Sequence, residues 1–249
     1  LAERRFYDGS VVSAVAFTRY GHRIAVAHML PREVVESGFM VNRVDLYDAR
    51  TLEFIEPIWT ANYDQFVNRI WFTESGRLIL AVDTTWHLPS EFQVLDATTY
   101  ERLATIEDVA FTSNIDVSAD ESLALLSSSG STIVLYDLNN LKEVWRIKGL
   151  NSHFATLHPG GDRFYAYSSN GYGVIAALED GREIVQIDEG GPSAAFSPEG
   201  STLYTVPGQT GWFNAAYGRA IVATPSWIED MDDLQAWQRE NLSTLVSRH

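Results

Sequence analysis

The chain contains no cysteine, and this absence removes several chemistries at once. Without thiols there are no disulfides, no thiolate metal sites and no cysteine nucleophile. A cysteine-free chain is compatible with both the cytosol and the periplasm. We expect a cytoplasmic location, with the periplasm as the alternative.

Long apolar runs are missing as well. The sequence has no stretch of about 18 apolar residues that could form a membrane-spanning helix, and no basic segment followed by an apolar one at its start. We therefore expect no membrane span. Because the chain begins at Leu1 rather than Met, we expect a processed or excised piece of a larger protein.

Positive charge is scarce, with 18 Lys and Arg against 33 Asp and Glu and a formal net charge of −15. Nucleic acids and anionic membranes are bound through clustered cations, so neither is an expected partner. A protein partner with basic patches fits this charge better. The simpler alternative is that the acidic balance serves only solubility.

What the chain does contain is a four-residue turn that recurs five times between short apolar runs. The turns start at Thr18, Thr73, Ser118, His158 and Ser197, which are 55, 45, 40 and 39 residues apart. A period near 40 residues with four β-rich runs per repeat is typical of a propeller blade. The sequence therefore predicts an all-β fold, a β-propeller of five visible four-stranded antiparallel blades over residues 1–225.

The predicted strands follow the same order in every repeat. They are 11–17, 23–27, 44–47 and 54–59 in the first; 69–72, 78–82, 92–95 and 103–106 in the second; 114–117, 123–126, 132–137 and 143–147 in the third; 153–157, 164–167, 174–177 and 183–187 in the fourth; and 193–196, 202–206, 212–216 and 221–223 in the fifth. Five blades can close into a ring. Alternatively, the ring is incomplete in this chain, and residues 4–7 belong to an earlier blade or complete the fifth.

Past Pro225 the pattern changes to that of a helix. Residues 226–229 (SWIE) have the pattern of a capping box, and Trp227, Met231 and Leu234 fall on one helical face. We predict a C-terminal amphipathic α-helix over residues 226–249, which either packs on the propeller or docks on a partner.

The third strands of the first three repeats end in Asp48, Asp96 and Asp137, each followed by a short polar turn. An aspartate there caps a tight turn by accepting backbone N–H bonds, so we predict a structural role. The fourth and fifth repeats are expected to carry Leu178 and Ala216 at this position.

These strand endings resemble the position at which WD-repeat propellers carry their Trp-Asp pair. Over roughly residues 6–225 the chain resembles the broad superfamily of WD-repeat-like and bacterial seven-bladed-type β-propellers, with divergent repeats and no Gly-His pair ahead of the strands. A weaker resemblance is to the heavy subunit of periplasmic quinoprotein amine dehydrogenases. It covers residues 23–54, where a strand and a long loop lead into residues 44–52 (VDLYDARTL). That resemblance implies a quinone on another subunit and no catalytic residues here.

Extra length is confined to two kinds of loop, those between the second and third strands and those between repeats. In a propeller these loops lie on one face, and they are longest in the first two repeats, where residues 28–40 form the largest insertion. Enlarged loops commonly carry function, and aromatic and charged loop side chains suit protein recognition. We predict partner-binding residues on this face: Arg32, Phe39, Tyr63, Asp64, Trp86 and His87.

No motif in the sequence indicates catalysis, a metal or a cofactor. His28, His87 and His153 can share the loop face, but no HxH or HExxH spacing is present. A Gly-x-Ser-x-Gly element is also missing. The expected function is a non-catalytic interaction or sensing module of a larger protein or complex, with the amine dehydrogenase subunit as the alternative.

Overall fold

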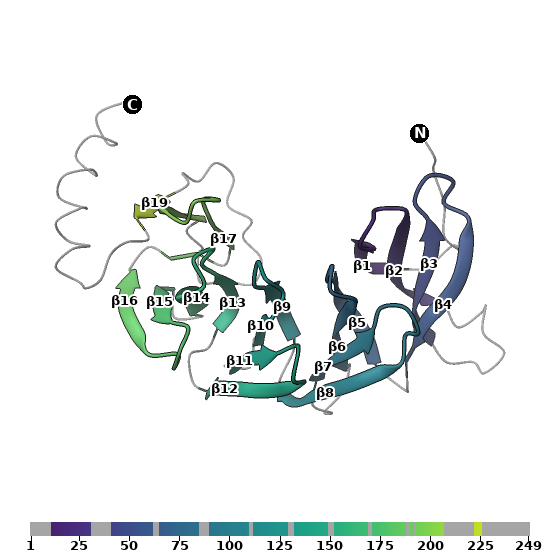
Figure 1. Ribbon diagram of the computed structural model, residues 1–249, viewed down its shortest axis with the longest axis horizontal. Helices are drawn as coiled ribbons and strands as arrows, with labels where there is room; N and C mark the ends of the chain where they lie inside the picture. Colours follow the sequence, from purple (N-terminus) through teal and green to yellow (C-terminus); the bar gives the residue numbers. More distant parts are fainter. Residues whose placement is uncertain are drawn as a thin grey trace. The chain divides into compact units, whose positions relative to one another are not determined.

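The computed structural model describes residues 11–30, 41–61, 65–84, 90–109, 112–128, 132–148, 152–168, 171–187, 190–191, 193–206 and 222–225. All regular structure in these ranges is β-strand, which confirms the predicted all-β class (Figure 1). Within this part of the chain no helix has the length and apolar character needed to cross a bilayer. The predicted C-terminal helix, residues 226–249, lies outside the described residues.

The chain divides into two compact units, Leu1–Lys148 and Gly149–His249. The first unit holds three four-stranded sheets whose strands pair in sequence order, every pair antiparallel. Their strands are β1 (Val11–Phe17), β2 (Arg23–Leu30), β3 (Val41–Asp48) and β4 (Phe54–Thr60); β5 (Gln65–Phe72), β6 (Arg77–Thr84), β7 (Ser90–Asp96) and β8 (Arg102–Val109); β9 (Thr112–Val117), β10 (Leu123–Ser128), β11 (Thr132–Asp137) and β12 (Lys142–Lys148).

The second unit holds a four-stranded and a three-stranded sheet of the same antiparallel kind. Their strands are β13 (Ser152–Leu157), β14 (Arg163–Ser168), β15 (Gly173–Ala177) and β16 (Glu183–Ile187); β17 (Ser193–Phe196), β18 (Thr202–Val206) and β19 (Val222–Pro225). Every strand predicted for the first four repeats is present.

The fifth repeat departs from its prediction. Residues 221–223 were expected to form the fourth strand, but Val222–Pro225 pairs directly with β18 and so takes the third place. Residues 212–216, the expected third strand, lie outside the described residues. Both segments have similar β propensity, and only long-range pairing decides which of them lies beside β18.

Neighbouring sheets within a unit pack face to face. Between the first two sheets, Ala25, Leu46 and Ile58 meet Leu78 and Leu80 in one buried cluster. A second cluster joins the second and third sheets of this unit, and a third joins the two sheets of the other unit. The central strand β6 is thus covered on both faces, which explains why it reads as a continuous apolar run rather than an alternating one.

The aspartates after the third strands cap their turns as predicted. The Asp48 carboxylate accepts the N–H groups of Arg50 and Thr51 at 2.9 and 2.8 Å, and Asp96 and Asp137 repeat this arrangement. These backbone bonds lower the pKa of Asp48 and of Asp96. At Asp137 the side-chain bond from Asn140 is the largest cause of the lowered pKa.

In the fourth sheet the equivalent residue is Ala177, not Leu178 as expected. The Ala177 N–H donates to the carbonyl of Arg182 as the Asp48 N–H does to that of Glu53, whereas Leu178 bonds to Asp162. The prediction was one residue too late because, without the aspartate, nothing in the sequence marks the start of this turn. Four residues on, Gly181 takes the left-handed conformation that Leu52 takes after Asp48.

Candidate functional site

All six residues predicted to bind a partner lie outside the described residues. They fall in the segments 31–40, 62–64 and 85–89, and their role stays a prediction: Arg32, Phe39, Tyr63, Asp64, Trp86 and His87. The structure does describe the strands from which these segments depart.

The hairpin that carries residues 31–40 is longer than its counterpart in the third sheet. The β2–β3 ladder runs from Arg23↔Asp48 to Leu30↔Val41, with 8 residues in each strand. The β10–β11 ladder has 6 residues in each strand and ends at Ser128↔Thr132. The additional length lies at the end of the sheet from which residues 31–40 leave, called the loop end. The turns at the opposite ends of the two sheets are alike.

A buried polar cluster lies near the loop end of this hairpin. His28 Nε2 is 2.6 Å from Asp45 Oδ2, and the Arg43 guanidinium donates to the same oxygen at 2.7 and 2.9 Å. The Tyr47 hydroxyl adds a fourth contact at 3.3 Å. Both His28 and Asp45 are buried, and a buried carboxylate requires such partners.

His28 is therefore bonded to Asp45 within this buried cluster. Within the described ranges, no group of three or more His, Asp or Glu side chains could hold a metal ion. His87 lies outside these ranges, and so does the side chain of His153.

Polar side chains also join the first two sheets at the loop end. Asn42 Nδ2 donates to the carbonyl of Gln65 at 2.5 Å, and Ser13 Oγ donates to that of Val67 at 2.5 Å. From the outer strand β4, Trp59 Nε1 donates to Gln93 Oε1 of β7 at 2.9 Å. The bond from Asn42 to Gln65 joins the strands that follow segments 31–40 and 62–64.

The opposite ends of the sheets carry the recurring turn between the first and second strands, called the first turn of each sheet. In each, the N–H of the fourth residue donates to the carbonyl of the first. That fourth residue has a positive φ, and it is Gly21, Gly76, Gly161 and Gly200 in four of the five turns. In the third sheet it is Glu121, with φ 56°.

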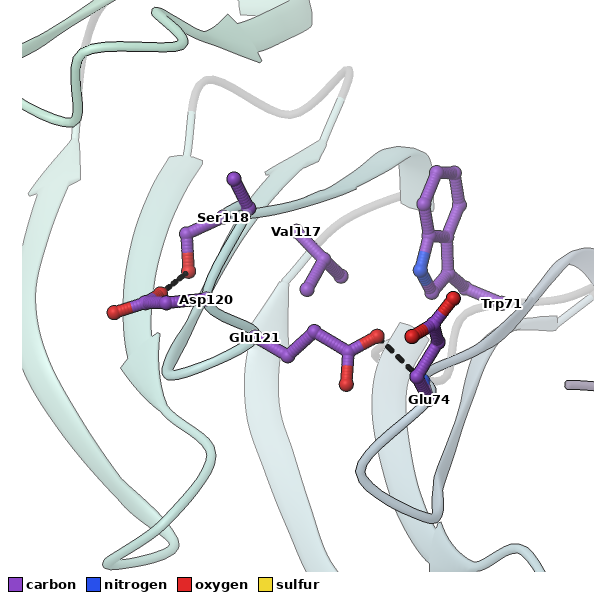
Figure 2. Close-up of a pocket in the computed structure, with 7 residues that line it drawn as sticks. Trp71, Glu74, Val117, Ser118, Asp120 and Glu121 are labelled. Carbon is purple, nitrogen blue, oxygen red and sulfur yellow. Dashed lines mark hydrogen bonds between the residues drawn. The ribbon is translucent and has the colours of Figure 1, made fainter.

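A side chain in this left-handed position is uncommon, and here it makes specific contacts. The Glu121 carboxylate accepts the N–H groups of Glu74 and Ser75, which are consecutive residues in the first turn of the second sheet. Figure 2 shows the bond from Glu74. Partial burial alone would raise the pKa of Glu121, but these backbone bonds outweigh it and lower the pKa. The carboxylate thus stays ionised and joins the two turns.

The contact between Glu121 and Glu74 lies at the edge of an open pocket of about 430 Å³ between the first turns of the second and third sheets (Figure 2). Trp71 and Val117 form its apolar part. The Ser118 hydroxyl donates to Asp120 at 2.7 Å. No histidine is among the described lining residues of this pocket.

A second pocket, of about 500 Å³, lies between the first turns of the first and second sheets. Arg19, His22 and Arg23 line it, and none of its described lining residues is Asp or Glu. The Arg19 guanidinium lies 4.9 Å from the ring centre of Tyr20, which is 70% exposed. On the pocket wall, burial raises the pKa of Tyr100, with Glu56 acting in the same direction and Arg23 against it.

The sequence analysis predicted neither the Glu121 contact nor the pocket lined by Arg19, His22 and Arg23, called the cationic pocket from here on. One signal was available, because Glu121 stands where the other four turns have glycine. Its acceptor role could not be predicted, since the donors lie 46 and 47 residues earlier in the chain.

No protein-family model matches the chain, and no curated protein matches it either.

Proposed function

We propose that the chain is a β-propeller recognition module that binds a protein partner within a larger protein or complex. The propeller assignment is supported by the repeated antiparallel meanders, the face-to-face packing of neighbouring sheets within each unit and the constant turn geometry. Such a scaffold holds loops in fixed positions and leaves the function to the loops.

The observation that carries this proposal is the construction of the loop end of the first two sheets. The β2–β3 hairpin is lengthened there, the buried Asp45 cluster stiffens it, and bonds from Ser13, Asn42 and Trp59 fix it to the second sheet. A binding surface needs rigid supports of this kind so that its loops lose little entropy on association.

The sequence supplies suitable contact residues in the segments attached to these supports. Tyr63 and Trp86 are of the aromatic types that dominate protein interfaces, and Arg32 is the charged type enriched there. With a net charge of −15 on the chain, the partner is expected to present basic patches.

The resemblance to the heavy subunit of quinoprotein amine dehydrogenases gains no separate support from the fold. Its segment, residues 44–52, forms the end of β3 and the turn capped by Asp48. The second and third sheets have the same turn, capped by Asp96 and Asp137. A feature shared by three sheets does not favour the amine dehydrogenase subunit over other propellers.

The test compares retention of a partner from cell extract by the parent chain and by three single variants. Trp86→Ala and Tyr63→Ala are each expected to weaken binding by about 2 kcal/mol, roughly 30-fold in affinity, at an unchanged melting temperature. The matched control is Trp71→Ala, which removes a 40% exposed tryptophan at the turn end and is expected to bind normally. Loop variants that bind normally but melt several degrees lower would show that the aromatics are core residues.

A further inference from the structure

The two pockets at the turn ends occupy equivalent places in the repeat. Each forms where the first turn of one sheet faces the fourth turn residue of the next sheet. In the Figure 2 pocket that fourth residue is Glu121, and in the cationic pocket it is Gly76. One difference between the pockets is therefore the presence or absence of a carboxylate side chain.

The Figure 2 pocket shows what this place in the repeat can bind. Two consecutive backbone N–H groups, those of Glu74 and Ser75, donate to the two oxygens of the Glu121 carboxylate. Consecutive N–H groups in a turn form a concave site that favours anions. The protein thus fills this site with a carboxylate of its own.

The equivalent donors in the cationic pocket are the N–H groups of Arg19 and Tyr20. No acceptor for either of them is found among the described residues. A side chain built on Gly76 would meet no atom within 4 Å at its Cβ, so the space in which the Glu121 side chain begins is open here.

The surroundings of these donors strengthen the case for an anion. Arg19, His22 and Arg23 line the pocket without a carboxylate among its described lining residues, in a chain whose net charge is −15. The exposed ring of Tyr20 adds an apolar surface beside the charges. A small free anion gains little from that ring, whereas a peptide side chain with its flanking backbone can pack on it.

We propose that the pocket between the first and second sheets binds the carboxylate of an acidic peptide segment, in the place that Glu121 occupies between the second and third sheets. The N–H groups of Arg19 and Tyr20 donate to this carboxylate, as those of Glu74 and Ser75 donate to Glu121. Arg23 supplies a charge-assisted contact. This site lies at the turn ends of the sheets and does not depend on the loop surface proposed above.

The test follows the backbone amide resonances of Arg19, Tyr20, Glu74 and Ser75 by NMR at constant pH and ionic strength. A capped Gly-Glu-Gly peptide is expected to shift the Arg19 and Tyr20 amides saturably and to leave those of Glu74 and Ser75 in place, because Glu121 already occupies them. The Gly-Gln-Gly peptide is expected to shift none of them. Equal responses to the two peptides, or no saturable response, would overturn the proposal, and so would tighter binding of inorganic phosphate than of the Glu peptide.

Variants separate the site from general electrostatics. Arg23→Gln is expected to weaken Glu-peptide binding about tenfold, the usual weight of a hydrogen bond to a charged group. Arg182→Gln removes an exposed arginine of the other unit, 71% accessible at its side chain, and is expected to leave binding unchanged. Equal losses in the two variants would show a nonspecific charge effect and overturn the assignment.

Glu121→Gly gives the third sheet the residue that the other four turns have at this position. Its removal should free the Glu74 and Ser75 N–H groups, so that their amides also respond to the Glu peptide. If these amides stay silent in a folded Glu121→Gly protein, the turn N–H groups do not bind carboxylates and the proposal fails.

Discussion

The interface between the first two sheets and the interface within the second unit solve the same packing problem differently. At the position of β2, β6 and β14 that faces the next sheet, the residues are Ala25, Ile79 and Tyr165 respectively. The first unit packs these faces mainly with aliphatic side chains, which need no polar partner. In the second unit a tyrosine fills the space, and its hydroxyl must be satisfied inside the core.

Glycines and a buried backbone segment accommodate Tyr165. Its hydroxyl donates to the Gly191 carbonyl at 2.9 Å and accepts the Gly191 N–H at 2.8 Å. A Cβ on Gly173 would lie 2.5 Å from the Tyr165 ring, and one on Gly190 would run into the backbone of Gly173. The aromatic interface is therefore tied to particular neighbours, whereas aliphatic interfaces tolerate exchange of similar side chains.

Truncation of the aromatic side chain is expected to have the largest effect. Tyr165→Ala should cost about 3–5 kcal/mol, because it leaves a large cavity and two unpaired groups at Gly191. Leu80→Ala, at the aliphatic interface, should cost about 2–5 kcal/mol from the cavity alone. Urea denaturation, monitored by hydrogen exchange in each unit, measures the loss of unfolding free energy in both variants. A loss clearly below about 3 kcal/mol for Tyr165→Ala would contradict this expectation.

The coupling between Tyr165 and Gly173 is the next effect in size. Gly173→Ala should destabilise the protein by about 1–3 kcal/mol through overpacking against the ring. In a Tyr165→Leu background, which gives this position an aliphatic side chain, the same change should cost little, so that the double-mutant cycle yields a coupling of about 1 kcal/mol or more.

Gly190→Ala is the control for that cycle. Its added methyl meets the backbone of Gly173 rather than the Tyr165 ring. Its cost should be the same in both backgrounds. If Tyr165→Leu rescued Gly190→Ala as well, the effect would be a general loosening of the sheet rather than relief of one contact.

The comparison also shows what the sequence could predict. The strands of the first four repeats and the turns capped by Asp48, Asp96 and Asp137 follow from local patterns. The place of β19 and the partners of Glu121 and Tyr165 do not, since they join residues far apart in the chain, 26 residues in the case of Tyr165 and Gly191. Local patterns fix which segments are strands, whereas pairing and packing depend on the whole fold.

The candidate sites also differ in whether local sequence patterns or long-range packing define them. The six residues predicted on the loop face were chosen from loop length and residue type, and they remain a prediction because they lie outside the described residues. The turn-end pockets arise where turns of different sheets meet, Thr18 with Gly76 and Ser118 with Glu74. No property of either turn alone indicates such a meeting.

The smallest expected effect is a pH dependence of the unfolding free energy that comes from the Tyr165 hydroxyl. Burial raises the pKa of this phenol above its ordinary value near 10, so the folded state holds the proton more tightly than the unfolded state does. The resulting stabilisation is complete below about pH 10 and is lost as the pH rises above that value, by at most about 1.4 kcal/mol per pH unit.

Tyr165→Phe removes this contribution while keeping the ring. At about pH 8 the variant should be less stable than the parent by about 1–3 kcal/mol, because the Gly191 N–H and carbonyl lose their partner. Above about pH 10 the gap should narrow, since only the parent must keep the Tyr165 phenol protonated in order to fold. Tyr100 and Tyr136, whose pKa values burial also raises, are present in both proteins and cancel in the difference. Urea denaturation of the two proteins at about pH 8 and about pH 10.5 measures the gap, and a gap of constant size would show that the hydroxyl ionises as readily in the folded protein as in the unfolded one.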